Sequence, residues 1–227
     1  MAINRLQLYN MALMLSGERS LVDLNEAREP RRLLDEVWNS NGREFALEQA
    51  QWWFAMRAVQ IDNDPSSTPD FGYNYAFNVP EDWVSTSSVC QDPYFLAPLI
   101  FHAAEPDYWY AAITPIYVKY VSKDDNYGFD ISRWPATFSD YVAAYFAGRI
   151  LPKLSGDKAA QRANLFGPPG AEHKGHIAMT LAKAKNAAAM TQPTQQIAQG
   201  RWTTSRRGSR RTRGPFGDGG TTGSLIG

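Results

Sequence analysis

The hydrophobic pattern of this chain changes period twice, and these changes constrain the fold more than any other sequence feature. Apolar residues recur at spacings of three and four over 3–58, alternate with polar residues over 73–121, and return to the helical spacing over 135–190. The helical spacing indicates amphipathic helices, and the alternation indicates strands. The order predicts an α+β, mainly α fold, which is a helical bundle with a small inserted antiparallel β-sheet.

The first helical segment, 3–58, contains two clear helix boundaries and one ambiguous position. Gly17 stands where a left-handed C-terminal cap would end the first helix. Pro30 lies in the opening turn of the second helix, where the missing proline N–H is not needed. Asn41–Gly42 either ends that helix or only weakens a longer helix that continues toward residue 58. The sequence leaves both alternatives open.

The middle segment favours several short strands. After a loop of turn-forming residues over 62–72, alternation predicts strands over 73–79 and 83–89, a less clear strand over 96–103, and a strand over 113–121. Five prolines lie within or beside these strands. Because proline cannot donate a ladder hydrogen bond, the strands are expected to be short or to lie at sheet edges.

The last helical segment, 135–190, is expected to hold three helices. Pro135 opens the first, Asp157 caps a short helix that runs through Leu165, and the GPPG break at 167–170 precedes a helix from about 171 to 190. After Thr191 the composition turns to Gln, Gly, Ser, Thr and Arg, with too few large apolar residues to fold alone. The chain is predicted to comprise a folded domain, 1–190, and an extended Arg/Gly/Ser-rich C-terminal tail, 191–227.

Charge is distributed unevenly between these two parts. The chain has 23 Lys and Arg and 23 Asp and Glu, so its formal net charge is zero. Six arginines and one acid, Asp218, give 191–227 a formal charge of +5 and leave −5 on 1–190. Arginine binds phosphates and carboxylates. Since residues 1–190 are acidic and would repel duplex DNA, docking of the tail on an acidic protein surface is favoured, and a DNA-binding module is the alternative.

No sequence pattern predicts a catalytic or metal site. His173 and His176 stand three positions apart, but no full set of ligands accompanies them. Cys90, the single cysteine, has no basic neighbour and is expected to be buried and inert. His102 is expected to be packed or solvated, and the acidic clusters of 61–157 lack the spacing of a calcium loop. We therefore expect no enzyme activity, no cofactor and no metal.

Compartment and membrane association are also constrained. One cysteine excludes an intramolecular disulfide, as expected for a chain that matures in a reducing compartment. No apolar run approaches the ~20 residues that cross a bilayer, so no membrane partner is expected.

Three segments, taken in order, carry a resemblance to a known family. They are EAREPRRLLDEVWNSNGREFALEQAQWWFAMR (26–57), FGYNYAFNVPEDWV (71–84) and YVKYVSKDDNYGFDISRWPATFSDYVAAYFAGRILPKLSG (117–156). The first resembles the N-terminal helical signature of tailed-phage head-to-tail adaptor proteins, the tail tubular protein A family. The second resembles the tyrosine-rich strand of that family, and the third its last strand, linker and Leu/Ala-rich helix. The tail after Met190 carries no motif of the family.

The resemblance implies a structural protein of the virion in which 1–190 is an adaptor domain. Proteins of this family form a dodecameric ring beneath the portal protein, extend the DNA channel and present a platform to the tail nozzle or tail tube. The implied partners are further copies of the chain, the portal and the nozzle or tube protein. Duplex DNA would pass through the channel during genome ejection without sequence-specific binding. Synthesis would take place in the host bacterial cytoplasm.

Two sets of residues are candidates for the contacts of such a ring. Abundant aromatic residues suit large interfaces, although core packing explains some of them equally well; they are Trp52, Trp53, Tyr108, Trp109 and Tyr110. The tail would contact the portal or a neighbouring subunit through Arg201, Trp202, Arg206, Arg207, Arg210, Arg211 and Arg213.

Overall fold

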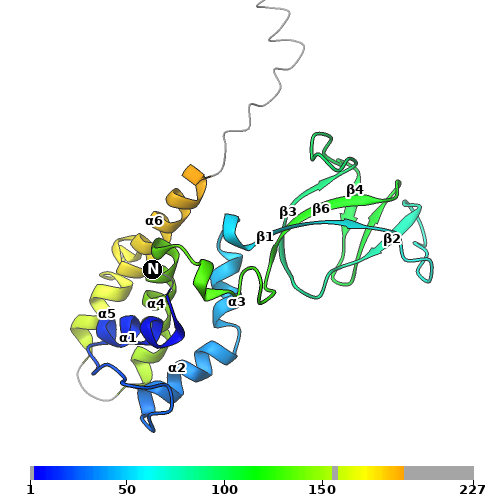
Figure 1. Ribbon diagram of the computed structural model, residues 1–227. Helices are drawn as coiled ribbons and strands as arrows, with labels where there is room; N and C mark the ends of the chain where they lie inside the picture. Colours follow the sequence, from blue (N-terminus) through cyan, green and yellow to red (C-terminus); the bar gives the residue numbers. More distant parts are fainter. Residues whose placement is uncertain (1–2, 155–157, 192–227) are drawn as a thin grey trace, which may run out of the picture. The chain divides into compact units, whose positions relative to one another are not determined.

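The computed structural model describes residues 3–154 and 158–191, and it has an α+β fold (Figure 1). The α-helices of this part are α1 (Arg5–Ser16), α2 (Glu29–Asn39), α3 (Gly42–Glu48), α4 (Ala136–Ile150), α5 (Ala159–Phe166) and α6 (His176–Thr191). The strands are β1 (Met56–Ile61), β2 (Tyr75–Asn78), β3 (Trp83–Cys90), β4 (His102–Ala104), β5 (Tyr108–Ala111) and β6 (Ile116–Ser122). The predicted order of helices, strands and helices is confirmed.

Local sequence signals set both ends of α1. The Asn4 side chain accepts a hydrogen bond from the Gln7 N–H at 2.8 Å, and the Gln7 side chain accepts one from the Asn4 N–H at 3.0 Å. This reciprocal pair is a capping box, which satisfies N–H groups that have no partner inside the helix. Gly17 ends the helix with a φ of 70°, so the predicted left-handed cap is confirmed.

Helix α4 is the central helix of the helical core. Ten of its 15 residues are buried, and it packs against α1, α2 and α6. Small residues let the neighbouring helices approach closely. A Cβ added at Gly148 would lie 2.8 Å from the Ile177 Cδ1 of α6, closer than van der Waals contact permits.

The ambiguity at Asn41–Gly42 is resolved as a break between two helices. Helix α2 ends at Asn39, Ser40 is extended, and α3 begins at Gly42. A Cβ at position 42 would lie 2.4 Å from the Val37 carbonyl oxygen, so only glycine fits where the chain turns this sharply.

The prediction that the helices extend to residue 58 is wrong. After α3 the chain makes a short 3-10 turn over Trp53–Ala55, and residues 56–58 begin strand β1. Strand β1 pairs antiparallel with β6, so that Met56 faces Val121 and Ile61 faces Ile116. These partners are remote in sequence, and their pairing outweighs the local helical pattern.

The prediction of a single sheet over 73–121 is also corrected. The strands form two three-stranded sheets, with orders β1-β6-β3 and β2-β5-β4, and all pairs are antiparallel. Strand β5 was not predicted because it has four residues and follows Pro106 and Asp107. The strand predicted over 96–103 is reduced to His102–Ala104.

The two sheets share a second hydrophobic core, separate from that of the helices. Buried side chains from both sheets meet in it: Phe77, Val89, Leu99, Trp109, Ala111, Ile116, Val118 and Tyr120. Such face-to-face packing makes a small β-sandwich. The sequence between α3 and α4 therefore forms a unit with its own interior, inserted into a helical bundle.

The C-terminal helices agree with the prediction apart from their boundaries. Helix α5 begins at Ala159, and Asp157, its predicted cap, lies outside the described residues. The last helix begins at His176 instead of residue 171, because a 3-10 turn over Glu172–Lys174 precedes it. Gly175 follows that turn against the backbone of Gly167, whose N lies 2.7 Å from where a Cβ would be. The backbone of Gly175 is extended, with φ −66° and ψ 152°, so the helix cannot begin before His176.

Candidate functional site

The residues predicted to bind a partner lie outside the described residues. These are Arg201, Trp202, Arg206, Arg207, Arg210, Arg211 and Arg213. Their role stays a prediction, and the candidate surfaces of the described part of the chain belong to residues 3–154 and 158–191.

The catalytic and metal candidates His173, His176, His102 and Cys90 belong to four different elements. His173 is exposed in a 3-10 turn and His176 starts α6; in the described ranges no three His, Cys, Asp or Glu side chains are grouped as metal ligands. His102 Nδ1 lies 2.9 Å from the Leu99 carbonyl oxygen and donates to it. Cys90 is buried as predicted, and burial raises the pKa of its thiol.

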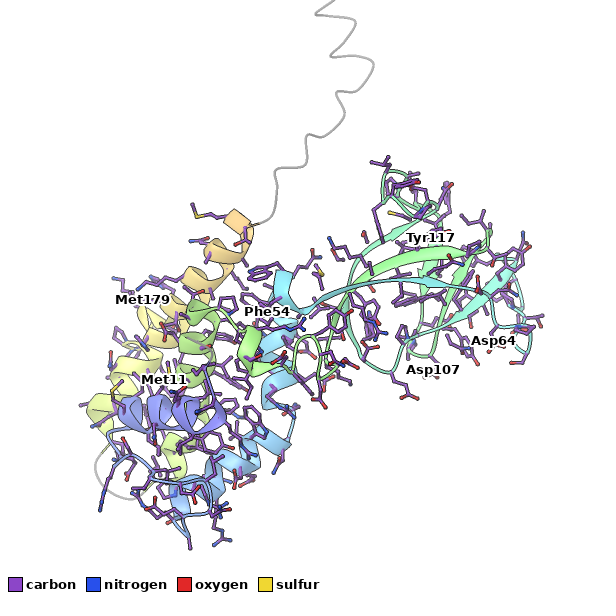
Figure 2. All side chains as sticks on the ribbon, viewed as in Figure 1. Met11, Phe54, Asp64, Asp107, Tyr117 and Met179 are labelled. Carbon is purple, nitrogen blue, oxygen red and sulfur yellow. The ribbon has the colours of Figure 1, made fainter. Side chains whose placement is uncertain are left out.

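Four aromatic side chains form a joint where the helical core meets the strands. We call Trp52, Phe54, Trp134 and Phe138 the aromatic joint. The Phe138 ring lies 4.7 Å from Trp52, 4.9 Å from Phe54 and 4.9 Å from Trp134, measured between ring centroids. Trp52 and Phe54 precede β1, and Trp134 and Phe138 follow β6. The aromatic joint therefore lies both where the chain leaves the helical core for the strands and where it returns. Figure 2 labels Phe54 at this position.

The indole nitrogens of the aromatic joint have hydrogen-bond partners. Trp52 Nε1 donates to the Ala46 carbonyl oxygen at 3.1 Å, and Trp134 Nε1 donates to the Gly128 carbonyl oxygen at 2.8 Å. Burial of these rings therefore leaves no indole N–H unsatisfied. Val84 and Val121, from β3 and β6, also belong to the helical core, so the strands themselves reach into it.

Asp82 connects strands beside this joint. Its carboxylate accepts hydrogen bonds from Arg57 at 2.9 Å, from the Tyr120 hydroxyl at 2.9 Å and from the Ser122 hydroxyl. Burial acts to raise the pKa of Asp82, but the hydrogen bonds from Ser122, Arg57 and Tyr120 outweigh it and hold the pKa below its usual value. Burial raises the pKa of the Tyr120 hydroxyl.

Trp38, in the first segment of the resemblance, is contacted by two arginines. The guanidinium of Arg5 lies 4.9 Å from its ring centroid and that of Arg43 lies 4.5 Å away. Arg43 also lies 3.9 Å from the Phe129 ring centroid, in the loop after β6. Burial lowers the pKa of Arg43. These contacts tie α1, α3 and the loop after β6 together through cation–π attraction.

The loop between β3 and β4 presents apolar side chains to solvent. We call residues 91–101 the apolar loop. Its exposed members are Tyr94, Leu96, Ile100 and Phe101, each about four-fifths accessible. The Asp92 carboxylate accepts backbone N–H groups of Tyr94, Leu96 and Ala97, which fixes the loop conformation, and these bonds lower the pKa of Asp92. An ordered loop with several large apolar side chains in water is typical of a protein-binding surface.

A hollow lies between α1 and the beginning of α4. We call it the α1–α4 groove. Its volume is about 550 Å³, and its apolar lining includes Ile3, Met11, Met14 and Trp134. The Met11 and Met14 side chains are flexible and polarisable, which suits contact with varied apolar groups.

The outer face of the β2-β5-β4 sheet carries tyrosines. Tyr108 and Tyr110 alternate on β5 with the buried Trp109 and Ala111, so the two tyrosines point away from the sandwich core. Tyr73 stacks on Tyr110 with ring centroids 6.4 Å apart, and Tyr108 lies 6.3 Å from Tyr110. We call these three residues the tyrosine face.

The aromatic candidates from the sequence therefore divide into two groups. Trp52 and Trp109 are buried core residues, whereas Trp53, Tyr108 and Tyr110 remain accessible. Sequence reasoning counted Asp82 only among the acidic clusters of 61–157 and missed its bonds to Arg57, Tyr120 and Ser122; it also missed the apolar loop. The sequence does signal that the strand part of the chain is acidic, because no Lys or Arg occurs between Arg57 and Lys119.

No protein-family model matches this chain, and no curated protein is significantly similar to it in sequence. Among the described residues, no helix has both the length and the apolar character needed to span a bilayer.

Proposed function

We propose that this protein is a structural head-to-tail adaptor of a tailed bacteriophage. In this proposal several copies form a ring between the portal and the tail nozzle or tube, and the ring extends the DNA channel. The protein would act through geometry and interface energy, without a cofactor or a catalytic step, as part of the virion.

The observation that carries the proposal is the position of the three resembling segments in the fold. They are not scattered: 26–57 contributes Trp52 and Phe54 to the aromatic joint, and 117–156 contributes Trp134 and Phe138. The segment 71–84 ends at Val84, which packs in the helical core beside Val121. The resemblance thus falls on the residues that connect the helical bundle to the inserted sandwich.

A connection of this kind suits an adaptor. Fixed aromatic packing, with both indole N–H groups bonded, would transmit the position of one part of the molecule to the other without a loose hinge. An adaptor needs such a rigid relation, because one part would contact the portal and the other the tail.

Two unlike apolar surfaces also support the proposal. A ring closes through heterologous contacts, in which one surface of a subunit meets a different surface of the next. The apolar loop and the α1–α4 groove are different in shape and lie on different elements, the β3–β4 connection and the helical bundle. They would supply the two sides of such a contact.

The proposal is tested by mass photometry of the purified full chain, alone and mixed with a phage portal assembly. We expect the chain alone to be a monomer. Mixed with the chain, the portal should gain the mass of many copies, since a template can favour an assembly that the free subunits do not form. A chain that never adds to the portal, but shifts duplex DNA at low salt and releases it as salt is raised, would contradict the adaptor and favour the DNA-binding module.

A further inference from the structure

The sandwich has an unusual charge composition. From 58 to 118 the chain has no Lys or Arg, and its acids are Asp62, Asp64, Asp70, Glu81, Asp82, Asp92, Glu105 and Asp107. Asp82 is compensated by Arg57, which lies just before this range. Figure 2 shows Asp64 and Asp107 on the strand part of the molecule. A surface of this composition attracts cationic groups and repels phosphates.

Part of this charge surrounds the tyrosine face. A hollow of about 280 Å³ lies between the loop that precedes β2 and the strands β4 and β5. Its lining combines aromatic rings, Phe71, Tyr73 and Tyr110, with the carboxylates of Asp70 and Glu105. The Phe71 side chain is 87% accessible, so this ring is exposed to solvent at the edge of the hollow.

Small side chains lie opposite Tyr110 in its own sheet. Its register partners on the two adjacent strands are Ala76 and Ala103, and Ala103 lines the hollow together with Tyr110. Desolvation, followed by the charge and hydrogen bond of Glu105, raises the pKa of the Tyr110 hydroxyl. The carboxylate of Glu105 is therefore close to the Tyr110 hydroxyl, and both residues line the hollow.

Among side chains, arginine is best suited to bind where aromatic faces lie beside uncompensated carboxylates. A guanidinium stacks on an aromatic ring and at the same time donates paired hydrogen bonds to a carboxylate. A purely apolar partner would leave Asp70 and Glu105 desolvated without compensation, and a nucleic acid would be repelled.

We propose that the tyrosine face and its hollow bind the arginine-rich segment 201–213 of a neighbouring copy of this chain. The segment has six arginines and one tryptophan and no acid, so its charge is opposite to that of the face. The chain continues for 36 residues after Thr191, the last described residue, and this segment lies in the middle of them. The inference rests on the proposed ring, in which each subunit has a neighbour.

The experiment is photo-cross-linking in the full chain assembled on a portal. Trp202→p-benzoylphenylalanine places the cross-linker in the segment, and mixing isotopically light and heavy protein separates contacts between copies from contacts within one copy. The products are digested with chymotrypsin, because trypsin has no cleavage site between Arg57 and Lys119. Mass photometry of the same sample reports whether the assembly formed.

We expect mixed light–heavy cross-links to peptides that contain Phe71, Tyr73 or Tyr110. Asp70→Asn with Glu105→Gln should reduce their yield about fivefold, because the two changes remove the carboxylates that would pair with the arginines, and exposed ion pairs contribute modestly. The control Asp62→Asn with Glu81→Gln makes the same charge change at exposed acids that do not line the hollow, and should leave the yield unchanged.

The outcomes separate this inference from the adaptor proposal. A portal-bound assembly without these cross-links, or with cross-links to the portal or within one copy alone, overturns the inference and leaves the adaptor intact. An equal loss of cross-link yield in the two double variants also overturns it. Such a result would show that the arginines are attracted by the overall negative charge and not by the carboxylates of the hollow. If no assembly forms, the adaptor proposal fails and the inference fails with it.

Discussion

At the scale of single residues, the carboxylate of Asp82 connects strands β1 and β6. It receives hydrogen bonds from Arg57 of β1 and from Tyr120 and Ser122 of β6, while its own backbone carbonyl accepts the Lys123 N–H at 2.7 Å. The hydroxyls of Tyr120 and Ser122, both fully buried, would lose this acceptor if the carboxylate were removed, whereas Arg57 is partly exposed to water. An unsatisfied buried donor costs about 1–3 kcal/mol.

We therefore expect Asp82→Ala to lower the free energy of unfolding by about 2–4 kcal/mol. The effect should depend on pH. The folded pKa of Asp82 is below the unfolded value of about 3.9, so its stabilisation is complete above that pH and is lost as the pH falls through the folded pKa. Urea unfolding from pH 7 to pH 2 checks this. A difference between wild type and Asp82→Asn that does not shrink below about pH 4 would contradict it.

Gly42 is a second residue with a large expected effect. A methyl group there would lie 2.4 Å from the Val37 carbonyl oxygen, so Gly42→Ala must displace the backbone between α2 and α3. We expect a loss of about 1–3 kcal/mol in thermal or chemical unfolding. Asn41→Ala, at an exposed neighbouring position, is the control and should change stability by less than about 0.5 kcal/mol. Equal effects of the two variants would show that the close contact is unimportant.

At the scale of elements, the sequence predicts those structures whose signals are local. Gly17 and Pro30 mark helix ends through the conformation of a single residue, and both predictions are confirmed. The strand β1 and the separation into two sheets depend on partners far along the chain, such as Val121 opposite Met56. No local pattern specifies these pairs. The spacing of apolar residues therefore predicts helix up to residue 58, although β1 begins at Met56.

The candidate surfaces show the same limit. The acidity of the sandwich is visible in the sequence, but the grouping of Tyr73 with Tyr110 requires the fold of the loop before β2. The sequence does not reveal the apolar loop, because Leu96 and Phe101 fit the pattern of the strand predicted over 96–103. In the structure they are exposed, because Asp92 holds the backbone in a compact loop.

The apolar loop gives a prediction at this scale. Leu96→Ser with Ile100→Ser should leave the melting temperature nearly unchanged, since both side chains are about four-fifths exposed. The same change should weaken ring formation, because each buried leucine or isoleucine contributes about 1.5–3 kcal/mol to an interface. Val22→Ser with Met190→Ser alters equally exposed residues elsewhere and is the control. Mass photometry with a portal measures the bound copies, and equal binding by both variants would exclude the loop from the ring contact.

At the scale of the whole molecule, the aromatic joint connects two hydrophobic cores. The helical core and the sandwich core each have their own buried residues, and Trp52, Phe54, Trp134 and Phe138 connect the chain crossings between them. The formal charge of zero hides an acidic part and a basic part of the same chain. Both features are expected of a subunit that contacts different partners at different surfaces.

The proposed ring can be seen in averaged electron-microscopy images of the full chain mixed with a portal. We expect a closed ring of copies, stacked coaxially on the portal, with an open channel continuous with that of the portal. Copies bound singly or at irregular positions on the portal, or a ring that blocks the channel, would contradict the assignment as a head-to-tail adaptor.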